Sequence, residues 1–308
     1  MEVTAVAGGV GGSKLLVGLQ QAQPDGSLTA VVNTADDAVI YGVHVSPDVD
    51  IVTYWLAGLA DTARGWGLEA DTFNVVGAFE RLGLDTWFGL GDADLATCLF
   101  RTTRMAEGAT LSAVTDEIRR ALGVTTTIIP MSDDPVRTRM VCGDGRTLDF
   151  QDYFVKERQQ PAVKDVRFAG IADAKPAPGV IEAIRDADRV VLCPSNPVVS
   201  VGPILALSGV REALREHPDV VAVSPIVAGR PIKGPADKLL PVLGAEVTAA
   251  GVATLYRDFC NTFVVDSVDR QELALVEELG MRAIAVDTIM SDSESSLRLA
   301  QDLLALQP

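Results

Sequence analysis

Cysteine pairs and clusters of basic residues are both missing from this sequence, and each absence excludes a class of protein. The four cysteines lie far apart without a C-x-x-C pair, so neither a disulfide framework nor a zinc knuckle is indicated, and a reduced, cytoplasmic location is expected. Only six of the 26 basic residues are lysines, no basic run occurs, and the formal net charge is −16. Because nucleic-acid binding needs clustered positive charge, no nucleic-acid partner is expected.

A targeting segment and an unbroken membrane span are missing too. The N-terminus has neither the cationic start nor the apolar length of a signal peptide, so we expect the mature chain to begin at Met1. Residues 190–210 carry no charge and are long enough to cross a bilayer as a helix. Pro194, Pro197 and Pro203 would each remove a helical hydrogen bond there. A buried strand, a tight loop and a helix are predicted instead, with no membrane partner.

What the sequence does contain is a regular alternation of strand-like and helical patterns. With 308 residues and 48% hydrophobic content, the chain can bury a large core. The predicted strands span 3–7, 28–32, 189–193, 220–223, 261–265 and 282–286, and the predicted helices span 14–21, 48–59, 71–82, 93–107, 111–122, 200–207, 236–243, 271–279 and 293–306. This order predicts an α/β fold with a Rossmann-like, doubly wound, mostly parallel sheet.

The middle of the chain differs from its two ends. Helical patterns dominate after the second predicted strand, and residues 127–151 are strand-like around a Cys142-Gly143-Asp144-Gly145 turn, which indicates a β-hairpin. We therefore expect a helical and β-hairpin insertion or lid at about 60–170. Because no repeat or long linker is present, residues 1–308 are predicted to form one domain.

A glycine-rich loop separates the first predicted strand from the first predicted helix. It consists of Gly8, Gly9, Val10, Gly11, Gly12 and Ser13. In an α/β sheet, backbone N–H groups at this position and the helix N-terminus can bind a diphosphate, with Ser13 as a helix cap. Lys14 follows Ser13 and stands where a third fingerprint glycine would be, so the loop matches neither a P-loop nor a dinucleotide-binding motif. The alternative interpretation is a tight turn that requires flexible backbone.

Acidic residues follow the second predicted strand and begin the next helix. Asp36 and Asp37 lie at a carboxyl strand end, where adjacent carboxylates suit Mg²⁺, although on an arbitrary loop they are usually solvated turn residues. Asp48 and Asp50 follow Ser46 and Pro47, as a helix start requires without catalysis. The four carboxylates could nevertheless converge on one cation. Nearby His44 is either a base or a hydrogen-bonded core histidine.

A third strand-end loop is stiff and polar but uncharged. Pro194, Ser195, Asn196 and Pro197 follow the predicted strand 189–193 and suit the edge of a neutral heterocycle, or else form only a rigid turn. Trp66 and Trp87 offer rings for stacking, although buried aromatic side chains usually just pack.

Several of these stretches together resemble the 2-phospho-L-lactate transferase family, whose bacterial members include phosphoenolpyruvate transferases. They are Ala7–Gly12, Val31–Asp37, Ser46–Asp50, Trp87–Asp92, Phe150–Phe154, Pro194–Pro203 and Ser224–Ile226, which match in order and spacing. The resemblance covers nearly the whole chain. It implies a Rossmann-like fold, a homodimer and a role in coenzyme F-420 biosynthesis. The implied reaction moves a phospho-acid from a guanosine-diphospho donor to the ribityl hydroxyl of the deazaflavin Fo and releases GMP.

The resemblance also assigns roles to numbered residues. The implied nucleotide-binding residues are Gly8, Gly9, Val10, Gly11, Gly12 and Ser13. The implied ligands of a Mg²⁺ cofactor are Asp36, Asp37, Asp48 and Asp50, and Asp36 and Asp37 are also the candidate catalytic residues. The implied deazaflavin-binding residues are Asn33, Trp87, Asp92, Pro194, Ser195, Asn196 and Pro197. Cys98 stands where relatives are expected to have histidine, and Ala35 where they often have glycine, so no role is transferred to Cys98.

Two other classes of protein are alternatives. A related family of nucleotide-sugar-binding regulators shares the glycine loop and an Ala-Asp-Asp segment, but its members continue with glycines and serines, whereas this chain continues Ala38-Val39-Ile40-Tyr41-Gly42. A nicotinamide-dependent oxidoreductase needs the missing third glycine, although Asp36 could be mistaken for its ribose-binding acid. Within the transferase hypothesis, the donated acid could be phospholactate, phosphoenolpyruvate or phosphoglycerate.

Overall fold

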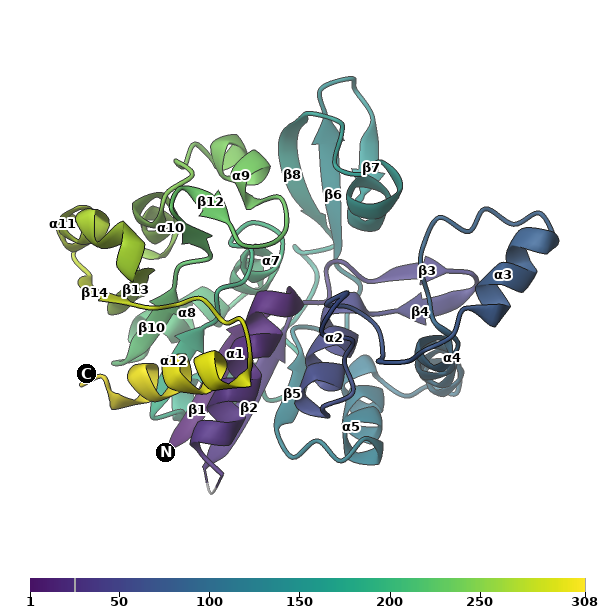
Figure 1. The fold of residues 1–308 in the computed structure, drawn as a ribbon, viewed down its shortest axis with the longest axis horizontal. Coiled ribbons are helices and arrows are strands. Elements are labelled where there is room, and N and C mark those ends of the chain that lie inside the picture. The colour runs from purple at the N-terminus through teal and green to yellow at the C-terminus, as the bar shows by residue number, and fades with distance from the viewer. Residues whose placement is uncertain (25, 308) are drawn as a thin grey trace.

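A seven-stranded parallel sheet forms the centre of the computed structural model, which describes residues 1–24 and 26–307 (Figure 1). In spatial order its strands are β14 (Arg282–Val286), β13 (Thr262–Asp266), β10 (Val220–Val223), β9 (Arg189–Leu192), β1 (Glu2–Ala7), β2 (Ser27–Val32) and β5 (Thr127–Pro130). All neighbouring pairs run parallel. The predicted Rossmann-like α/β class is therefore confirmed.

The order of the strands reverses next to β1. On one side β1 pairs with β2, which follows it in the chain, and on the other side with β9, which begins only at Arg189. In open α/β sheets ligands bind outside the carboxyl ends of the strands at such a switch point. The loops that follow β1, β2 and β9 are consequently the ones that can form a site.

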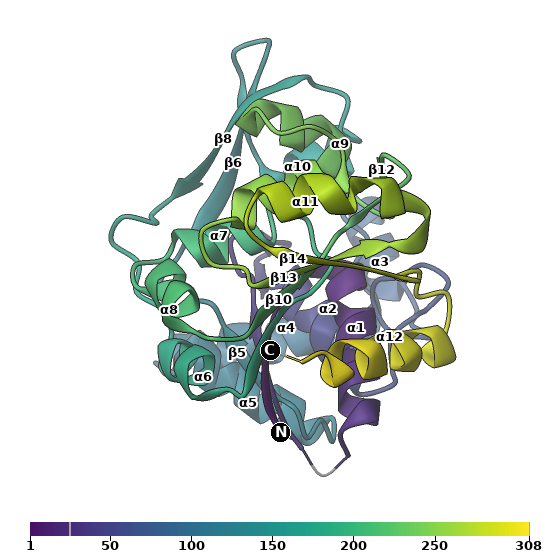
Figure 2. The same ribbon diagram turned by 90° about the vertical axis from the view of Figure 1, so that its left-hand side faces the viewer.

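Helices cover both faces of the sheet, as double winding requires. One face carries α1 (Gly9–Ala22), α2 (Pro47–Leu56) and α12 (Ser293–Ala305), and the other carries α6 (Val180–Asp186), α7 (Val201–Ala206), α8 (Val210–Glu216), α10 (Ala249–Tyr256) and α11 (Leu273–Glu278). Along β1, Val3 and Ala5 pack toward the first group of helices and Val6 toward the second. Figure 2 shows α12, at the C-terminal end, lying beside α1.

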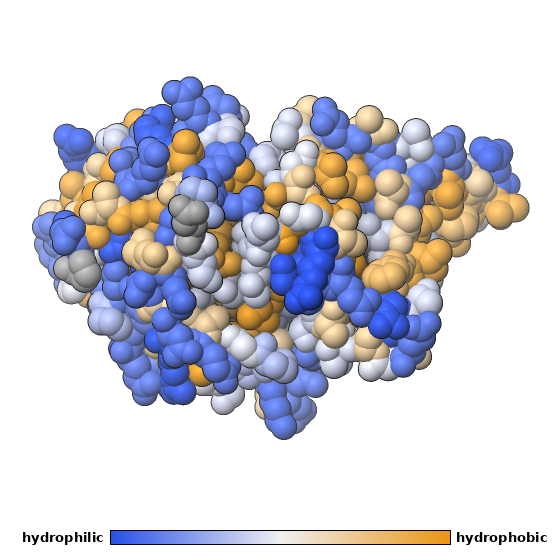
Figure 3. Space-filling view, turned by 90° about the horizontal axis from the view of Figure 1, so that it is seen from below, coloured by the Kyte–Doolittle hydropathy of each residue, from blue (hydrophilic) through white to orange (hydrophobic). Residues whose placement is uncertain are grey.

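A separate arm extends from the body of the molecule (Figure 1). We define it as residues 38–45 and 71–106, with the hairpin β3 (Ala38–Ile40) and β4 (Val43–Val45) and the helices α3 (Asn74–Arg81) and α4 (Asp92–Ala106). Its small core includes Ile40, Val45, Leu90 and Cys98. Apolar residues gather at this end of the molecule in Figure 3, and Leu82 is 82% exposed. Helix α5 (Leu111–Ala121) links the arm to β5.

A second, antiparallel sheet stands above the central one (Figure 1). It consists of β6 (Arg137–Cys142), β7 (Thr147–Asp149) and β8 (Val163–Ala169), in the order β7-β6-β8. The predicted hairpin around residues 142–145 is confirmed, and β8 was not predicted. The insertion was expected at about 60–170. However, β5, which lies in that range, is an edge strand of the central sheet and not part of an insertion. A π-helical turn (Asp152–Lys156) joins β7 to β8, and short elements follow β10, namely β11 (Ile226–Val227), β12 (Arg230–Pro231) and α9 (Ala236–Leu239).

The start of α1 differs from the prediction. The helix begins at Gly9, with Gly8 at the N-cap position, so the glycine run forms the first helical turn instead of a loop before it. Ser13 is therefore not the predicted cap: it is buried inside the helix, where its hydroxyl donates to the Gly9 carbonyl at 2.8 Å. Of the helices within the described ranges, none has both the length and the apolar character needed to cross a membrane.

Candidate active site

The glycine loop after β1 packs tightly against the loop after β9. A Cβ atom on Gly11 would lie 2.6 Å from the Pro194 carbonyl oxygen, and one on Gly12 would lie 2.7 Å from the Ser195 hydroxyl. A Cβ atom on Gly8 would lie 2.5 Å from a carboxylate oxygen of Asp48. Real side chains do not approach so closely, so these three glycines are required by contacts within the protein itself.

Two N–H groups of the glycine loop are already occupied. Ser195 Oγ accepts a hydrogen bond from the Gly8 N–H at 3.1 Å, and Asp48 Oδ1 accepts one from the Gly9 N–H at 2.9 Å. The first N–H groups of a helix have no partner within the helix. Val10 and Gly11, in this first turn, therefore carry the N–H groups best placed to bind an anion.

Asn33, at the end of β2, organises two carboxylates. Its side-chain nitrogen lies 3.2 Å from Asp36 Oδ2, 2.9 Å from Asp48 Oδ2 and 3.3 Å from the Val199 carbonyl. Its oxygen accepts a hydrogen bond from the Ala35 N–H at 3.0 Å. Since Asn33 is fully buried and its amide is used within the protein, the structure gives it the role of holding the acidic residues together.

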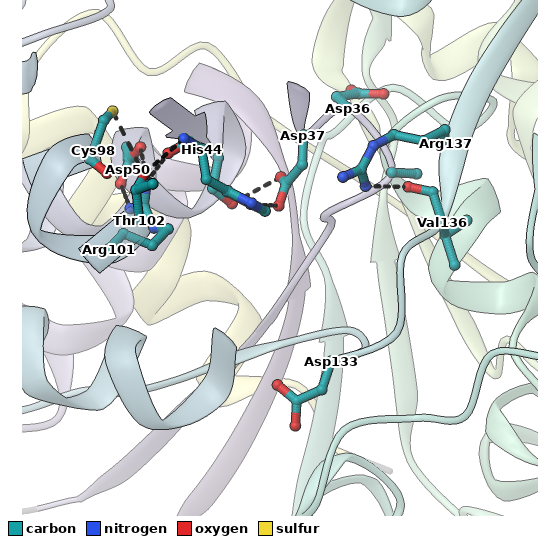
Figure 4. A network of polar contacts seen from close by, with 12 residues as sticks. Asp36, Asp37, His44, Asp50, Cys98, Arg101, Thr102, Asp133, Val136 and Arg137 are labelled. Atoms are coloured by element: carbon teal, nitrogen blue, oxygen red, sulfur yellow. Dashed lines mark hydrogen bonds and ion pairs between the residues drawn. The ribbon is translucent and has the colours of Figure 1, made fainter. Parts of the chain in front are cut away.

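Asp37 is held by two donors from the segment that leads into α2. His44 Nε2 lies 2.8 Å from Asp37 Oδ2 (Figure 4). The Ser46 hydroxyl donates to Asp37 Oδ1 at 2.7 Å. Ser46 occupies the N-cap position of α2, but its side chain does not cap the helix. Of the two interpretations of His44, the structure shows a hydrogen-bonded histidine whose partner is a candidate site residue.

Burial and mutual repulsion characterise the group of Asp36, Asp37 and Asp48. Burial first, and then the neighbouring Asp48 and Asp37, raise the pKa of Asp36 well above its ordinary value. Burial also raises the pKa of Asp48 to about 6. Asp36 Oδ1 is buried and has no hydrogen-bond partner within normal geometry among the described residues, although the nearby Thr138 hydroxyl partly offsets the rise in the pKa of Asp36. The group therefore presents one free carboxylate oxygen at the switch point.

Asp50, the fourth predicted metal ligand, belongs to a different network. It forms an ion pair with Arg101 of α4, which is fully buried (Figure 4). Asp50, Asp94 and Cys98 each place one potential ligand atom within 4.8 Å of the others. However, Arg101 already supplies the positive charge there, and burial raises the pKa of the Cys98 thiol, so it stays protonated. We therefore interpret this group as a structural ion pair.

Arg101 was not identified from the sequence as a residue of this region. It lies 51 positions after Asp50 and within an ordinary amphipathic helix, so no local pattern distinguishes it from a surface arginine. Only the packing of α4 against β4 brings the two residues together.

The predicted deazaflavin-binding residues fall into two places. Ser195 exchanges hydrogen bonds with Gly8 and is committed to that contact. Asn196 Oδ1 accepts from the Val198 N–H at 2.9 Å, while its Nδ2 is buried without a partner among the described residues. Pro194 and Pro197 flank them, and the Pro194 carbonyl faces Gly11. In this loop Asn196 therefore retains a donor for a ligand.

Trp87 and Asp92 lie in the arm. Trp87 packs edge to face on Phe88, and the Lys156 ammonium lies 5.6 Å from the centre of its ring. Asp92 accepts hydrogen bonds from the Thr72 hydroxyl at 2.6 Å and from the Val75 N–H at 2.9 Å. These contacts give Asp92 the role of fixing the start of α3.

Comparison with known proteins shows the family of this chain. The model of the family described as 2-phospho-L-lactate transferase CofD matches residues 3–303. A 2-phospho-L-lactate transferase of Methanosarcina mazei is 41% identical over 96% of this chain and 97% of its own. A phosphoenolpyruvate transferase of Streptomyces griseus is 42% identical over 99% of this chain and 98% of its own.

Solved structures share the fold at much lower identity. The crystal structure of a UPF0052 family member from Bacillus halodurans superposes with a TM-score of 0.66 at 18% identity, covering 98% of each chain. This likeness supports the fold alone. The fold defines a Rossmann-like α/β protein, a class in which ligands typically bind at the switch point of the sheet. Matched over nearly its whole length, the chain belongs to the 2-phospho-L-lactate transferase CofD family and is a transferase.

Proposed function

We infer that this protein acts in coenzyme F-420 biosynthesis, where it transfers a phospho-acid from a guanosine-diphospho donor to the ribityl hydroxyl of the deazaflavin Fo. The observation that carries this inference is the group of Asp36, Asp37 and Asp48 beside the glycine loop of a chain in the CofD family. The donated acid is phospholactate or phosphoenolpyruvate, the groups that appear in the names of the relatives.

In the proposed reaction the hydroxyl oxygen of Fo attacks the phosphorus that carries the acid. A new P–O bond forms to Fo, the P–O bond to the bridging oxygen breaks, and GMP leaves with that oxygen. The hydroxyl proton passes to Asp36 Oδ1, the free carboxylate oxygen of the group. A raised pKa suits a carboxylate to accept a proton near neutral pH, and burial gives Asp36 this property.

The chemistry of the same group suits a Mg²⁺ ion. Its donors are all oxygen atoms, and of the described basic side chains only His44 lies within ion-pair distance of Asp36, Asp37 or Asp48. We propose that Asp37 and Asp48 hold the ion and that Asp50, paired with Arg101, does not. When bound, Mg²⁺ would neutralise charge that develops on the diphosphate.

The nucleotide side of the proposal rests on the first turn of α1. The N–H groups of Val10 and Gly11 would bind the diphosphate, since the N–H groups of Gly8 and Gly9 already have partners. The buried Asn196 Nδ2 would donate to a substrate group at the facing loop. Positioning both substrates on these rigid strand ends favours in-line transfer.

The direct test is to supply Fo, Mg²⁺ and each guanosine-diphospho acid, and to follow GMP by chromatography and the product by mass. We expect GMP release to need both Fo and Mg²⁺. Asp36→Asn should lower kcat by about 100-fold or more, because it removes the proton acceptor. Asp186→Asn, an exposed aspartate at the end of α6, is the matched control and should retain full activity.

Full turnover in excess chelator would contradict the metal assignment, and unchanged turnover by Asp36→Asn would contradict the base. Tight binding of a uridine nucleotide sugar without any turnover would favour the regulator instead. A cytoplasmic homodimer is part of the same proposal, and light scattering of the purified protein tests the dimer.

A further inference from the structure

We propose that His44 is a positioning residue for Asp37, and that α4 in turn holds His44 through Thr102 and Arg101. This inference rests on the proposed function, because it concerns how one of its carboxylates is oriented. It assigns a role in the active site to α4, a helix of the arm. Among the described residues, α4 makes no hydrogen bond to the glycine loop.

The first step is the contact between the two side chains. His44 Nε2 lies 2.8 Å from Asp37 Oδ2, and the imidazole is only 16% exposed. The Ser46 hydroxyl donates to the other carboxylate oxygen. A carboxylate with one fixed donor on each oxygen has a single orientation, and its remaining lone pairs then point in defined directions.

The second step is the hold of α4 on the backbone of His44. The Thr102 hydroxyl accepts a hydrogen bond from the His44 N–H at 2.7 Å. Arg101 Nη1 donates to the His44 carbonyl at 3.1 Å while the same guanidinium binds Asp50 of α2 (Figure 4). Both backbone polar groups of His44 are thus fixed by consecutive residues of one helix.

The third step is that the strand partner of His44 gives it little side-chain support. In the two-stranded sheet His44 is the partner of Val39, whose side chain is 73% exposed and gives no buried support. An isolated two-stranded hairpin is only marginally stable. Without α4, the hairpin would let His44 move, and Asp37 would lose one of its two donors.

Helix α4 offers a matched pair of variants for the test. The Thr102 hydroxyl donates to the Cys98 carbonyl at 2.7 Å, and the Thr103 hydroxyl donates to the Leu99 carbonyl at 2.9 Å. The two threonines are neighbours with the same helical bond, but only Thr102 also accepts from His44. Thr102→Val and Thr103→Val each remove one helical hydrogen bond, but only Thr102→Val also removes the contact to His44.

We expect Thr102→Val to lower kcat by about 10-fold or more, with little change in the KM for either substrate, and Thr103→Val to leave both unchanged. His44→Ala should show the same loss. His44→Gln should recover much of it, because the glutamine amide can donate to Asp37 as the imidazole does. Binding of Mn²⁺ to the protein without substrates, measured by calorimetry, should weaken in parallel.

The inference is wrong if the two threonine variants behave alike, or if His44→Gln is as impaired as His44→Ala. Thermal unfolding of each variant shows that it is folded. If the wild-type protein releases no GMP in the assay, the proposed function is wrong, but the positioning role of His44 is not tested by that result. The Mn²⁺ affinities of Thr102→Val and Thr103→Val still test the positioning role in that case, and equal affinities would overturn it.

Discussion

Asp94 is a buried carboxyl group whose neighbours favour its protonated form. Burial first, and then the charge of Asp50, raise its pKa from 3.8 to about 7, although the Tyr54 hydroxyl donates to it at 2.8 Å. A carboxyl with a raised pKa binds protons more tightly in the folded chain than in the unfolded one. The free energy of unfolding that it contributes is therefore present below about pH 4 and is lost as the pH rises toward 7.

Asp94→Asn should consequently raise the melting temperature more at pH 8 than at pH 5. The pKa change corresponds to at most about 4 kcal/mol, and each kcal/mol moves the midpoint by roughly 2–4 °C. Thermal unfolding at the two pH values measures the difference. Asp186→Asn, at an exposed position, is the control and should change neither midpoint. An equal shift at both pH values would show that Asp94 does not titrate in this range.

At the scale of single residues, the sequence identifies which acidic side chains lie near one another but not which residues form hydrogen bonds to them. Asp36 and Asp37 follow the end of β2, and Asp48 lies in the first turn of the next helix, so the sequence places all three near one edge of the parallel sheet. The contact of His44 with Asp37 depends on a tight turn at Tyr41 and Gly42, which have φ of 52° and 84°. Arg101 reaches His44 from the distant helix α4, and no local pattern indicates that contact.

Helix α1 meets α12 at a point where only glycine fits. A Cβ atom on Gly18 would lie 2.2 Å from the Ser296 carbonyl oxygen, so the backbones of the two helices would have to separate. Gly77 in α3 is also helical, but its Cβ would meet nothing closer than Arg81 Nη1 at 3.9 Å.

The two glycines should therefore respond oppositely to alanine. Gly18→Ala is expected to cost about 1–3 kcal/mol of stability through overpacking. Gly77→Ala is expected to be neutral or to stabilise by up to about 1 kcal/mol, because alanine is the better helix former. Denaturant unfolding of both variants measures the two values. Equal effects would mean that the contact between α1 and α12 adjusts freely.

Strands with continuous apolar runs were predicted closely, and short helices and hairpin strands were not. The strand predicted at 220–223 coincides with β10, because a strand buried on both faces reads as a continuous apolar run. The helices α6 and α8 were missed. They have seven residues each and follow left-handed glycines, Gly179 and Gly209, which resemble loop signals. The hairpin β3–β4 has three-residue strands, too short for a periodic pattern.

The charge of the whole molecule opposes its proposed donor. The formal net charge is −16, and a guanosine-diphospho acid is itself an anion. Long-range repulsion slows the encounter of like charges, and salt screens it, with a Debye length of about 30 Å at 0.01 M and about 10 Å at 0.1 M.

Raising the ionic strength over this range, at constant free Mg²⁺, should increase kcat/KM for the donor by roughly twofold or more. Fo carries no diphosphate and provides an internal control, since its KM should change much less. Initial rates at several salt concentrations measure both. A fall in kcat/KM with salt would show that local positive charge near α1 outweighs the field of the molecule.

The position of β1 between β2 and β9 affects how the chain folds during its synthesis. While the ribosome is still making the middle of the protein, the first strand has only one neighbour, and its other edge stays open until Arg189–Leu192 emerges. Helix α1 stays without its partner α12 for longer, because α12 follows every strand of the sheet in the chain. Such distant pairings fold slowly and leave apolar edges exposed meanwhile. Nascent chains that stop before β9 should thus be natural clients of chaperones.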